Sequence, residues 1–146
     1  MDQKNILSVI NIGGNTKIAM PLFSDSVSAG FPSPATDYIE EDVDLNVHLI
    51  KNVPATFIIR VQGKSMTDVG IYDGDLLVVD RSLKPKNFST VVANVHDELV
   101  VKNFVKSKDQ SFLSSGSKKI EDKIIINQDS DVFIWGVVTY VIHSTY

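Results

Sequence analysis

From residue 55 onward, the sequence is a succession of short segments rich in β-branched and aromatic residues and separated by turn signals. The segments are ATFIIRVQ, DLLVVD, STVVANVH, ELVVKNFV, SFLSS, DKIIIN and VFIWGVVTYVIHSTY. The separators include Asp73-Gly74, His96-Asp97 and Ser115-Gly116-Ser117. No stretch of comparable length places its apolar residues at a helical period. This pattern predicts an all-β, mainly antiparallel, compact domain over residues 37–146.

The first fifty residues have a different character. Two short apolar pieces flank Gly13-Gly14-Asn15, which suggests a hairpin or a loose arm. Three prolines and several serines discourage both helix and central strand, so residues 21–36 are expected to be extended. A short helical piece is expected within residues 36–52, with Asp37 as its cap. We therefore expect residues 1–36 to form a flexible N-terminal arm.

Composition excludes several classes of function. The chain has 146 residues, a net charge of −4 and no cysteine, so disulfides, thiolate metal sites and cysteine nucleophiles are excluded. The negative charge argues against strong direct binding of nucleic acid. The absence of a secretory leader and of a long apolar run predicts a cytoplasmic protein without a membrane interaction.

Asp73-Gly74-Asp75 does not follow the calcium-loop pattern and is read as turn chemistry, so neither a metal nor a cofactor is expected.

Ser65, in the stretch RVQGKSMTDVG, is a candidate nucleophile. Taken alone, a serine after a glycine at the end of a strand is usually a turn residue. The surrounding Gly63-Lys64-Ser65-Met66-Thr67 lacks the second glycine of the α/β-hydrolase elbow. The three histidines have no spacing that indicates a Ser-His-Asp triad.

Lys102 is the candidate base because it is embedded in the apolar segment ELVVKNFV. An ordinary lysine is protonated at pH 7, and an apolar setting lowers its pKa by disfavouring the charged form. In a strand, Glu98 lies on the same face as Lys102 and would orient or tune the amine. The alternative is a lysine whose stem packs while its head reaches water.

The residues just described resemble the self-cleaving serine–lysine peptidases of the LexA and UmuD family. The resemblance is most specific at Gly63, at Ser65-Met66, at Gly74-Asp75 before an apolar run, and at Val101-Lys102. It covers residues 21–143 and is nearer to the UmuD branch, because PLFSD, GFPSPATDY and DLN are also UmuD-like. Ser65 and Lys102 lie 37 positions apart, as the family arrangement implies.

The resemblance implies that the substrate is the chain's own arm. The family cuts at a small residue followed by glycine, and Ala29-Gly30 fits, although a UmuD typically has cysteine at the first position. Ser65 would attack the Ala29 carbonyl, Lys102 would take the proton, and backbone N–H groups around Ser65 and Met66 would hold the oxyanion.

The family also implies partners and a purpose. The trimmed protein is expected to be a homodimeric accessory subunit of a UmuC-like error-prone translesion polymerase in the SOS response to DNA damage. A RecA–single-stranded-DNA filament is expected to stimulate cleavage, and the replicative sliding clamp is a further expected partner. Two alternatives stay open: a non-cleaving binding module of the same fold, and a trans-acting peptidase resembling bacterial signal peptidases.

Overall fold

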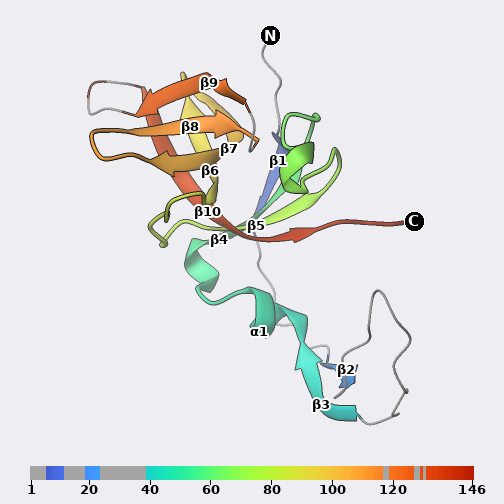
Figure 1. Cartoon of the computed structure of the whole chain (residues 1–146). Helices are drawn as coiled ribbons and strands as arrows, with labels where there is room; N and C mark the ends of the chain where they lie inside the picture. The colour runs from blue at the N-terminus through green and yellow to red at the C-terminus, as the bar shows by residue number, and fades with distance from the viewer. Residues whose placement is uncertain (1–5, 12–18, 24–38, 117–118, 127–128, 130) are drawn as a thin grey trace. The chain divides into compact units, whose positions relative to one another are not determined.

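The computed structural model describes residues 6–11, 19–23, 39–116, 119–126, 129 and 131–146 (Figure 1). The chain forms two compact units. One consists of residues 1–12 together with 52–146, and the other of residues 13–51. The predicted boundary at residue 36, between an arm and a β-rich domain, stays a prediction.

The larger unit is built on one sheet of eight strands in the order β1-β4-β5-β10-β6-β7-β8-β9. Every neighbouring pair in this sheet is antiparallel. The prediction of an all-β, mainly antiparallel fold is confirmed. The strands are β1 (Ile6–Asn11), β4 (Thr56–Val61), β5 (Leu76–Asp80), β6 (Thr90–Val95), β7 (Glu98–Lys106), β8 (Ser111–Ser115), β9 (Lys119–Ile126) and β10 (Val132–Ile142).

The long strand β10 joins the two halves of this sheet. Its first part pairs with β6 and its second part with β5, and the register shifts between Ile134 and Gly136 and again between Val138 and Tyr140. A Cβ added at Gly136 would lie 2.6 Å from Val79, so the two strands approach more closely than a side chain there would allow. Figure 1 shows β10 as the long ribbon that crosses from β6 to β5.

The core of the larger unit consists of two groups of buried apolar side chains. The group that we call cluster 1 draws on β4, β5, β6 and β7 and on the loop after β4, and its members are Ile59, Val61, Met66, Ile71, Leu77, Val79, Val92 and Val101. Cluster 2 consists of Val91, Ala93, Phe104, Leu113, Val132 and Val137. Two members of cluster 1, Met66 and Val101, are the sequence neighbours of Ser65 and Lys102. Packing of cluster 1 therefore fixes the backbone beside both candidate residues.

The smaller unit contains β2 (Ala19–Phe23), which pairs with β3 (Ile39–Asp44), and the short helix α1 (Leu45–Leu49). The helix predicted within residues 36–52 is thus shorter than expected and begins later. Asp44 is its cap and accepts a hydrogen bond of 2.9 Å from the Asn46 N–H, whereas Asp37 was the predicted cap. Strand pairing with β2 accounts for the difference, because residues 39–44 satisfy their backbone groups in a sheet instead of a helix.

The N-terminal apolar pieces also differ from the prediction of a hairpin or a loose arm. β1 pairs with β4 in the large sheet and β2 pairs with β3, so the two pieces do not pair with each other. Gly13-Gly14-Asn15 lies outside the described residues. Among the described residues, no helix is long and apolar enough to cross a membrane.

Candidate active site

Ser65 lies in the turn that follows β4 and precedes the 3-10 helix η2 (Thr67–Val69). The turn is held at its start by Asp73, whose carboxylate accepts a 2.7 Å hydrogen bond from the Gly63 N–H. Gly63 has a φ of 103°, a conformation that favours glycine. The carbonyl of Lys64 accepts from both the N–H and the hydroxyl of Thr67, at 3.3 and 3.0 Å. The half-buried Ser65 side chain is therefore carried by a turn with many internal hydrogen bonds.

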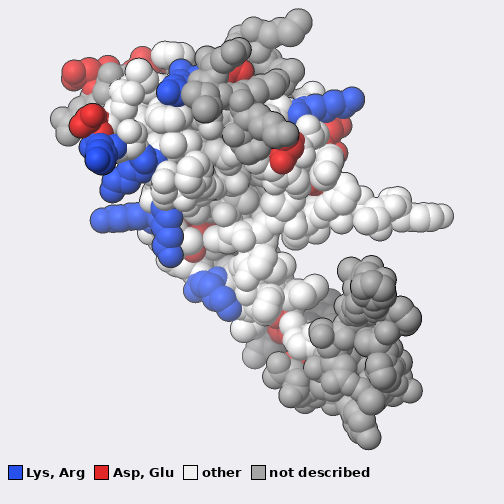
Figure 2. Space-filling model, viewed as in Figure 1, with Lys and Arg blue, Asp and Glu red and all other residues white. Residues whose placement is uncertain are grey.

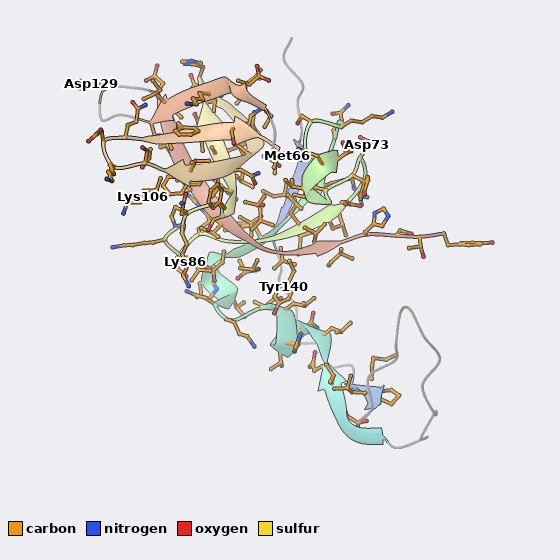
Figure 3. All side chains as sticks on the ribbon, in the orientation of Figure 1. Met66, Asp73, Lys86, Lys106, Asp129 and Tyr140 are labelled. Carbon is orange, nitrogen blue, oxygen red and sulfur yellow. The ribbon has the colours of Figure 1, made fainter. Side chains whose placement is uncertain are left out.

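Met66, beside Ser65, is part of the core. Its side chain is 2% exposed and belongs to cluster 1. Its carbonyl accepts hydrogen bonds from Val69 and Ile71, at 3.2 and 3.1 Å. Figure 3 labels Met66 and Asp73 on this loop. The predicted role of the backbone N–H groups at Ser65 and Met66 in holding an oxyanion stays a prediction.

Lys102 lies in the middle of β7, between the buried residues Val101 and Asn103. Its side chain is half-buried, and Nζ donates a hydrogen bond of 2.5 Å to the hydroxyl of Ser115 at the end of β8. Ser115 is only 4% exposed. The amine of Lys102 therefore has a buried hydroxyl as a partner. The alternative, in which the lysine stem packs and the amine only reaches water, does not predict such a partner.

The end of β8 connects the two candidate residues. Ser115 contacts the Lys102 amine, and the next residue, Gly116, donates its N–H to the Met66 sulfur at 3.3 Å. A Cβ added at Gly116 would lie 2.2 Å from a carboxylate oxygen of Asp68, in η2. The dipeptide Ser115-Gly116 is thus in contact with both the lysine and the loop that carries Ser65.

Glu98, predicted to orient the amine, lies at the start of β7. It pairs with Val95 across the β6–β7 hairpin, four residues before Lys102. Four residues of strand span about 13 Å between Cα atoms. The predicted role of Glu98 stays a prediction. Ala29 and Gly30, the predicted cleavage site, lie outside the described residues.

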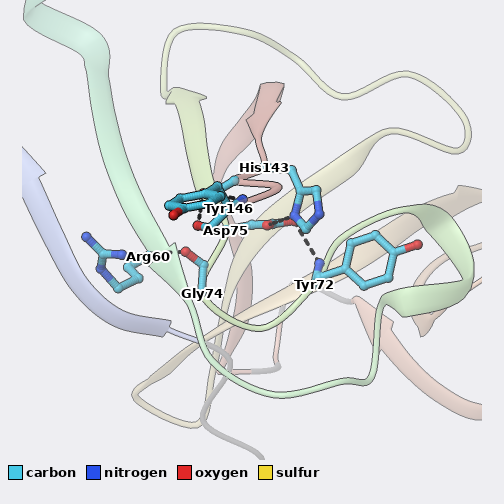
Figure 4. Close-up of polar contacts among 7 residues, drawn as sticks. Arg60, Tyr72, Gly74, Asp75, His143 and Tyr146 are labelled. Carbon is cyan, nitrogen blue, oxygen red and sulfur yellow. Dashed lines mark hydrogen bonds and ion pairs between the residues drawn. The ribbon is translucent and has the colours of Figure 1, made fainter.

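A second group of polar residues lies where the loop after Ser65 enters β5 (Figure 4). Asp75 is 3% exposed, and its two carboxylate oxygens contact the Tyr72 N–H at 2.8 Å and Nδ1 of His143 at 2.6 Å. The His143 ring lies against Tyr72, with ring centroids 5.1 Å apart. Gly74 has a φ of 88°. These contacts stabilise the Asp73-Gly74-Asp75 segment and join the loop to the end of β10.

The residues missed at the sequence level are Ser115, Gly116 and His143. Ser115 belongs both to the predicted strand segment SFLSS and to the separator Ser115-Gly116-Ser117, and neither assignment indicates a contact with Lys102. His143 lies 68 positions from Asp75, and nothing in the spacing brings the two together. Among the described residues, no group of three or more acidic or histidine side chains is arranged to hold a metal ion.

Charges of both signs are distributed over the larger unit on the face that Figure 2 shows. The projecting C-terminal segment is white in this view, which means that no Lys, Arg, Asp or Glu is seen there. The Lys and Arg side chains in this view gather mainly along the left side, with a few acidic side chains among them.

The fold and the site together define a β-rich domain with a serine in the turn after β4 and a lysine in β7. The residues at the end of β8 contact both the lysine and the turn. The model of the family described as Peptidase S24-like matches residues 21–139. The chain therefore belongs to the Peptidase S24-like family, and the resemblance to the self-cleaving LexA and UmuD peptidases is confirmed.

Three relatives show how far the likeness extends. Protein ImpA of Salmonella typhimurium is 42% identical over 132 residues, which cover 90% of this chain and 89% of that protein. Protein MucA of the same organism is 38% identical over 128 residues, or 88% of this chain and 87% of that protein. The LexA repressor of Glaesserella parasuis is 33% identical over 130 residues, which cover 89% of this chain and 61% of the repressor.

Proposed function

We propose that this chain is a UmuD-like peptidase that cuts its own arm between Ala29 and Gly30, with Ser65 as nucleophile and Lys102 as general base. The observation that carries the proposal is the hairpin end Ser115-Gly116, which contacts the Lys102 amine on one side and the neighbour of Ser65 on the other. Membership of a serine peptidase family supports the same assignment.

The reaction would proceed in two steps. Neutral Lys102 takes the Ser65 hydroxyl proton as Oγ attacks the Ala29 carbonyl carbon, and the resulting oxyanion is held by backbone N–H groups at Ser65 and Met66. The Lys102 ammonium then protonates the Gly30 nitrogen as the peptide bond breaks, which leaves residues 1–29 as an ester on Ser65. Water, deprotonated by Lys102, hydrolyses that ester and restores the serine.

The substrate in this scheme is part of the same protein, so binding is not a bimolecular encounter. The 35 residues from Gly30 to Ser65 reach on the order of 100 Å when extended, which is ample for attack within one chain or across a dimer. A tethered substrate raises the effective concentration of the scissile bond at the serine. Docking of the arm and deprotonation of the amine are then the steps that control the rate.

The biological role that we propose follows the UmuD-like relatives. Residues 30–146 would act as a homodimeric accessory subunit of a UmuC-like error-prone polymerase in the SOS response, together with the replicative sliding clamp. A RecA–single-stranded-DNA filament would raise the population of the cleavable arrangement. These partners act on chromosomal DNA, so the proposed compartment is the cytoplasm.

The experiment that tests this function compares two activating conditions. The purified chain is incubated at pH ~9–10, where more lysine is neutral, and separately at neutral pH with activated RecA filament. We expect loss of the first 29 residues on a gel in both conditions, and no loss for Ser65→Ala. An intact wild-type chain in both conditions would support the non-cleaving binding module instead. Faster cleavage of an added peptide that contains the Ala29-Gly30 bond would favour the trans-acting peptidase.

A further inference from the structure

The Lys102 amine is held by a hydroxyl on the neighbouring strand. The register of β7 and β8 pairs Asn103 with Ser114, which places Lys102 opposite Ser115. The hydrogen bond from Nζ to Ser115 Oγ is 2.5 Å long, and the hydroxyl is almost fully buried. A buried hydroxyl against a lysine head is a specific arrangement, because serine side chains are mostly found at the surface.

We propose that Ser115 is a positioning residue for the general base: its hydroxyl accepts a hydrogen bond from Lys102 Nζ and keeps the lone pair of the amine directed at Ser65. This inference rests on the proposed function, since it needs Lys102 to act as the base. Ser115 itself forms no bond with the substrate in this scheme.

A lysine base needs such an anchor because its side chain is long and flexible. Its four-carbon stem carries about 2 kcal/mol of rotamer entropy, so an unanchored amine spends little time in the one geometry that takes a proton. The hydrogen bond from Nζ to Ser115 removes part of this freedom, because it restricts the amine to the rotamers that reach the hydroxyl.

The anchor is itself tied to the nucleophile's loop. Gly116, which follows Ser115, donates to the Met66 sulfur at 3.3 Å, and the Asp68 carboxylate occupies the space that a Cβ at Gly116 would need. A displacement of the Ser65 loop would therefore displace the hydroxyl that holds the amine. This coupling keeps the base and the nucleophile in a fixed relation.

The hydrogen bond also has a definite effect on protonation. An ammonium donates to a hydroxyl more strongly than a neutral amine does, so the Ser115 acceptor favours the charged form of Lys102. Removal of the hydroxyl should thus lower the pKa of the amine while it loosens the amine's position. A residue with only a packing role would reduce the rate without this acid shift.

The first test is the pH profile of self-cleavage in Ser115→Ala. We expect the maximal rate at high pH to fall by roughly tenfold or more, and the midpoint of the profile to move to lower pH than in the wild type. Ser115→Thr keeps the hydroxyl and should restore both quantities. Ser114→Ala removes a neighbouring serine that is 6% exposed, and it should leave the midpoint unchanged. An unshifted midpoint in Ser115→Ala, whatever its rate, or the same changes in Ser114→Ala, would overturn the proposal.

A second measurement does not depend on cleavage. NMR titration of ¹³C-labelled lysine in the Ser65→Ala background gives the pH midpoint of this amine directly. The Lys102 signal is assigned as the one that disappears in Lys102→Arg. We expect Ser115→Ala to move that midpoint to lower pH, and an unchanged midpoint contradicts the proposal. If the wild type does not cleave at all, the proposed function fails, while this titration still decides whether Ser115 controls the amine.

Discussion

The Gly116 N–H donates a hydrogen bond to the sulfur of Met66, so the end of β8 lies directly on the loop that carries Ser65. Thioether sulfur is a weak acceptor, and the contact matters mainly because it fixes two segments that are 50 positions apart in sequence. One segment carries Ser65, and the other contacts the Lys102 amine through Ser115. Variants on each side of this contact therefore test the site without removing a reacting group.

Gly116→Ala should lower both the stability of the fold and the rate of cleavage. Gly116 has a φ of 69°, and an added Cβ would collide with the Asp68 carboxylate. Gly74→Ala is the matched control, because Gly74 has a φ of 88° and nothing within 4 Å of an added Cβ. We expect denaturant unfolding to show a loss of about 1–2 kcal/mol for Gly74→Ala from backbone strain, and a larger loss for Gly116→Ala. Equal losses of unfolding free energy in the two variants would show that the close approach of Asp68 to Gly116 does not affect stability.

Met66→Leu should separate the packing role of Met66 from its role as an acceptor. Leucine keeps the volume in cluster 1, so the free energy of unfolding should fall by less than about 1.5 kcal/mol. The Gly116 N–H loses its acceptor, and we expect self-cleavage at alkaline pH to slow several-fold. Met66→Ala should cost about 2–5 kcal/mol because it leaves a cavity. Cleavage of Met66→Leu at the wild-type rate would mean that the hydrogen bond from Gly116 to the Met66 sulfur does not position the site.

Asp73→Ala should slow cleavage because the carboxylate of Asp73 anchors the Gly63 N–H at the start of the serine turn. Loss of one such hydrogen bond costs about 1 kcal/mol of stability. The effect on the rate should be larger than this cost suggests, since the turn sets the position of Ser65. Asp109→Ala, at an exposed position between β7 and β8, removes the same charge elsewhere and should cleave like the wild type. Equal rates for the two variants would contradict the positioning role of Asp73.

His143→Ala should leave the cleavage rate within about twofold of the wild type. The Asp75–His143 contact has the form of the carboxylate–imidazole pair that orients a general base in serine hydrolases, so it is the rival to Lys102. In our account the pair holds the end of β10 against the loop, and its loss costs about 1–3 kcal/mol, because Asp75 is left buried with one partner fewer. Thermal unfolding measures this cost. Abolished cleavage in a folded His143→Ala would assign the base to the histidine.

The strands of the larger unit were predictable because their side chains alternate or are continuously apolar, and the turn residues between them are distinctive. Lys102 stood out because a lysine within an apolar strand conflicts with its surroundings. Ser65 taken alone fits an ordinary turn, and it became a candidate nucleophile through the resemblance to the serine–lysine peptidases. Residues 39–44 were harder, because an acidic segment with loosely spaced apolar residues fits a helix as well as a strand, and pairing with β2 decides the outcome.

The support around the site was not predictable in the same way. Ser115 occurs in a run of small polar residues that reads as a turn, and only the β7–β8 register brings it opposite Lys102. The Asp75–His143 contact depends on β10 pairing with β5, an event of tertiary structure. Local pattern and family resemblance therefore singled out the candidate residues, while the contacts that position them come from strand register.

Intact-mass spectrometry after alkaline incubation tests the central claim most directly. We predict that the wild type yields two fragments with the masses of residues 1–29 and 30–146, and that Ser65→Ala and Lys102→Ala each remain a single intact species. A rate that rises with pH in the wild type is expected as well, because the neutral fraction of the amine grows about tenfold per pH unit below its pKa. Fragments of the same masses from Lys102→Ala, or an uncut wild type, would contradict the account.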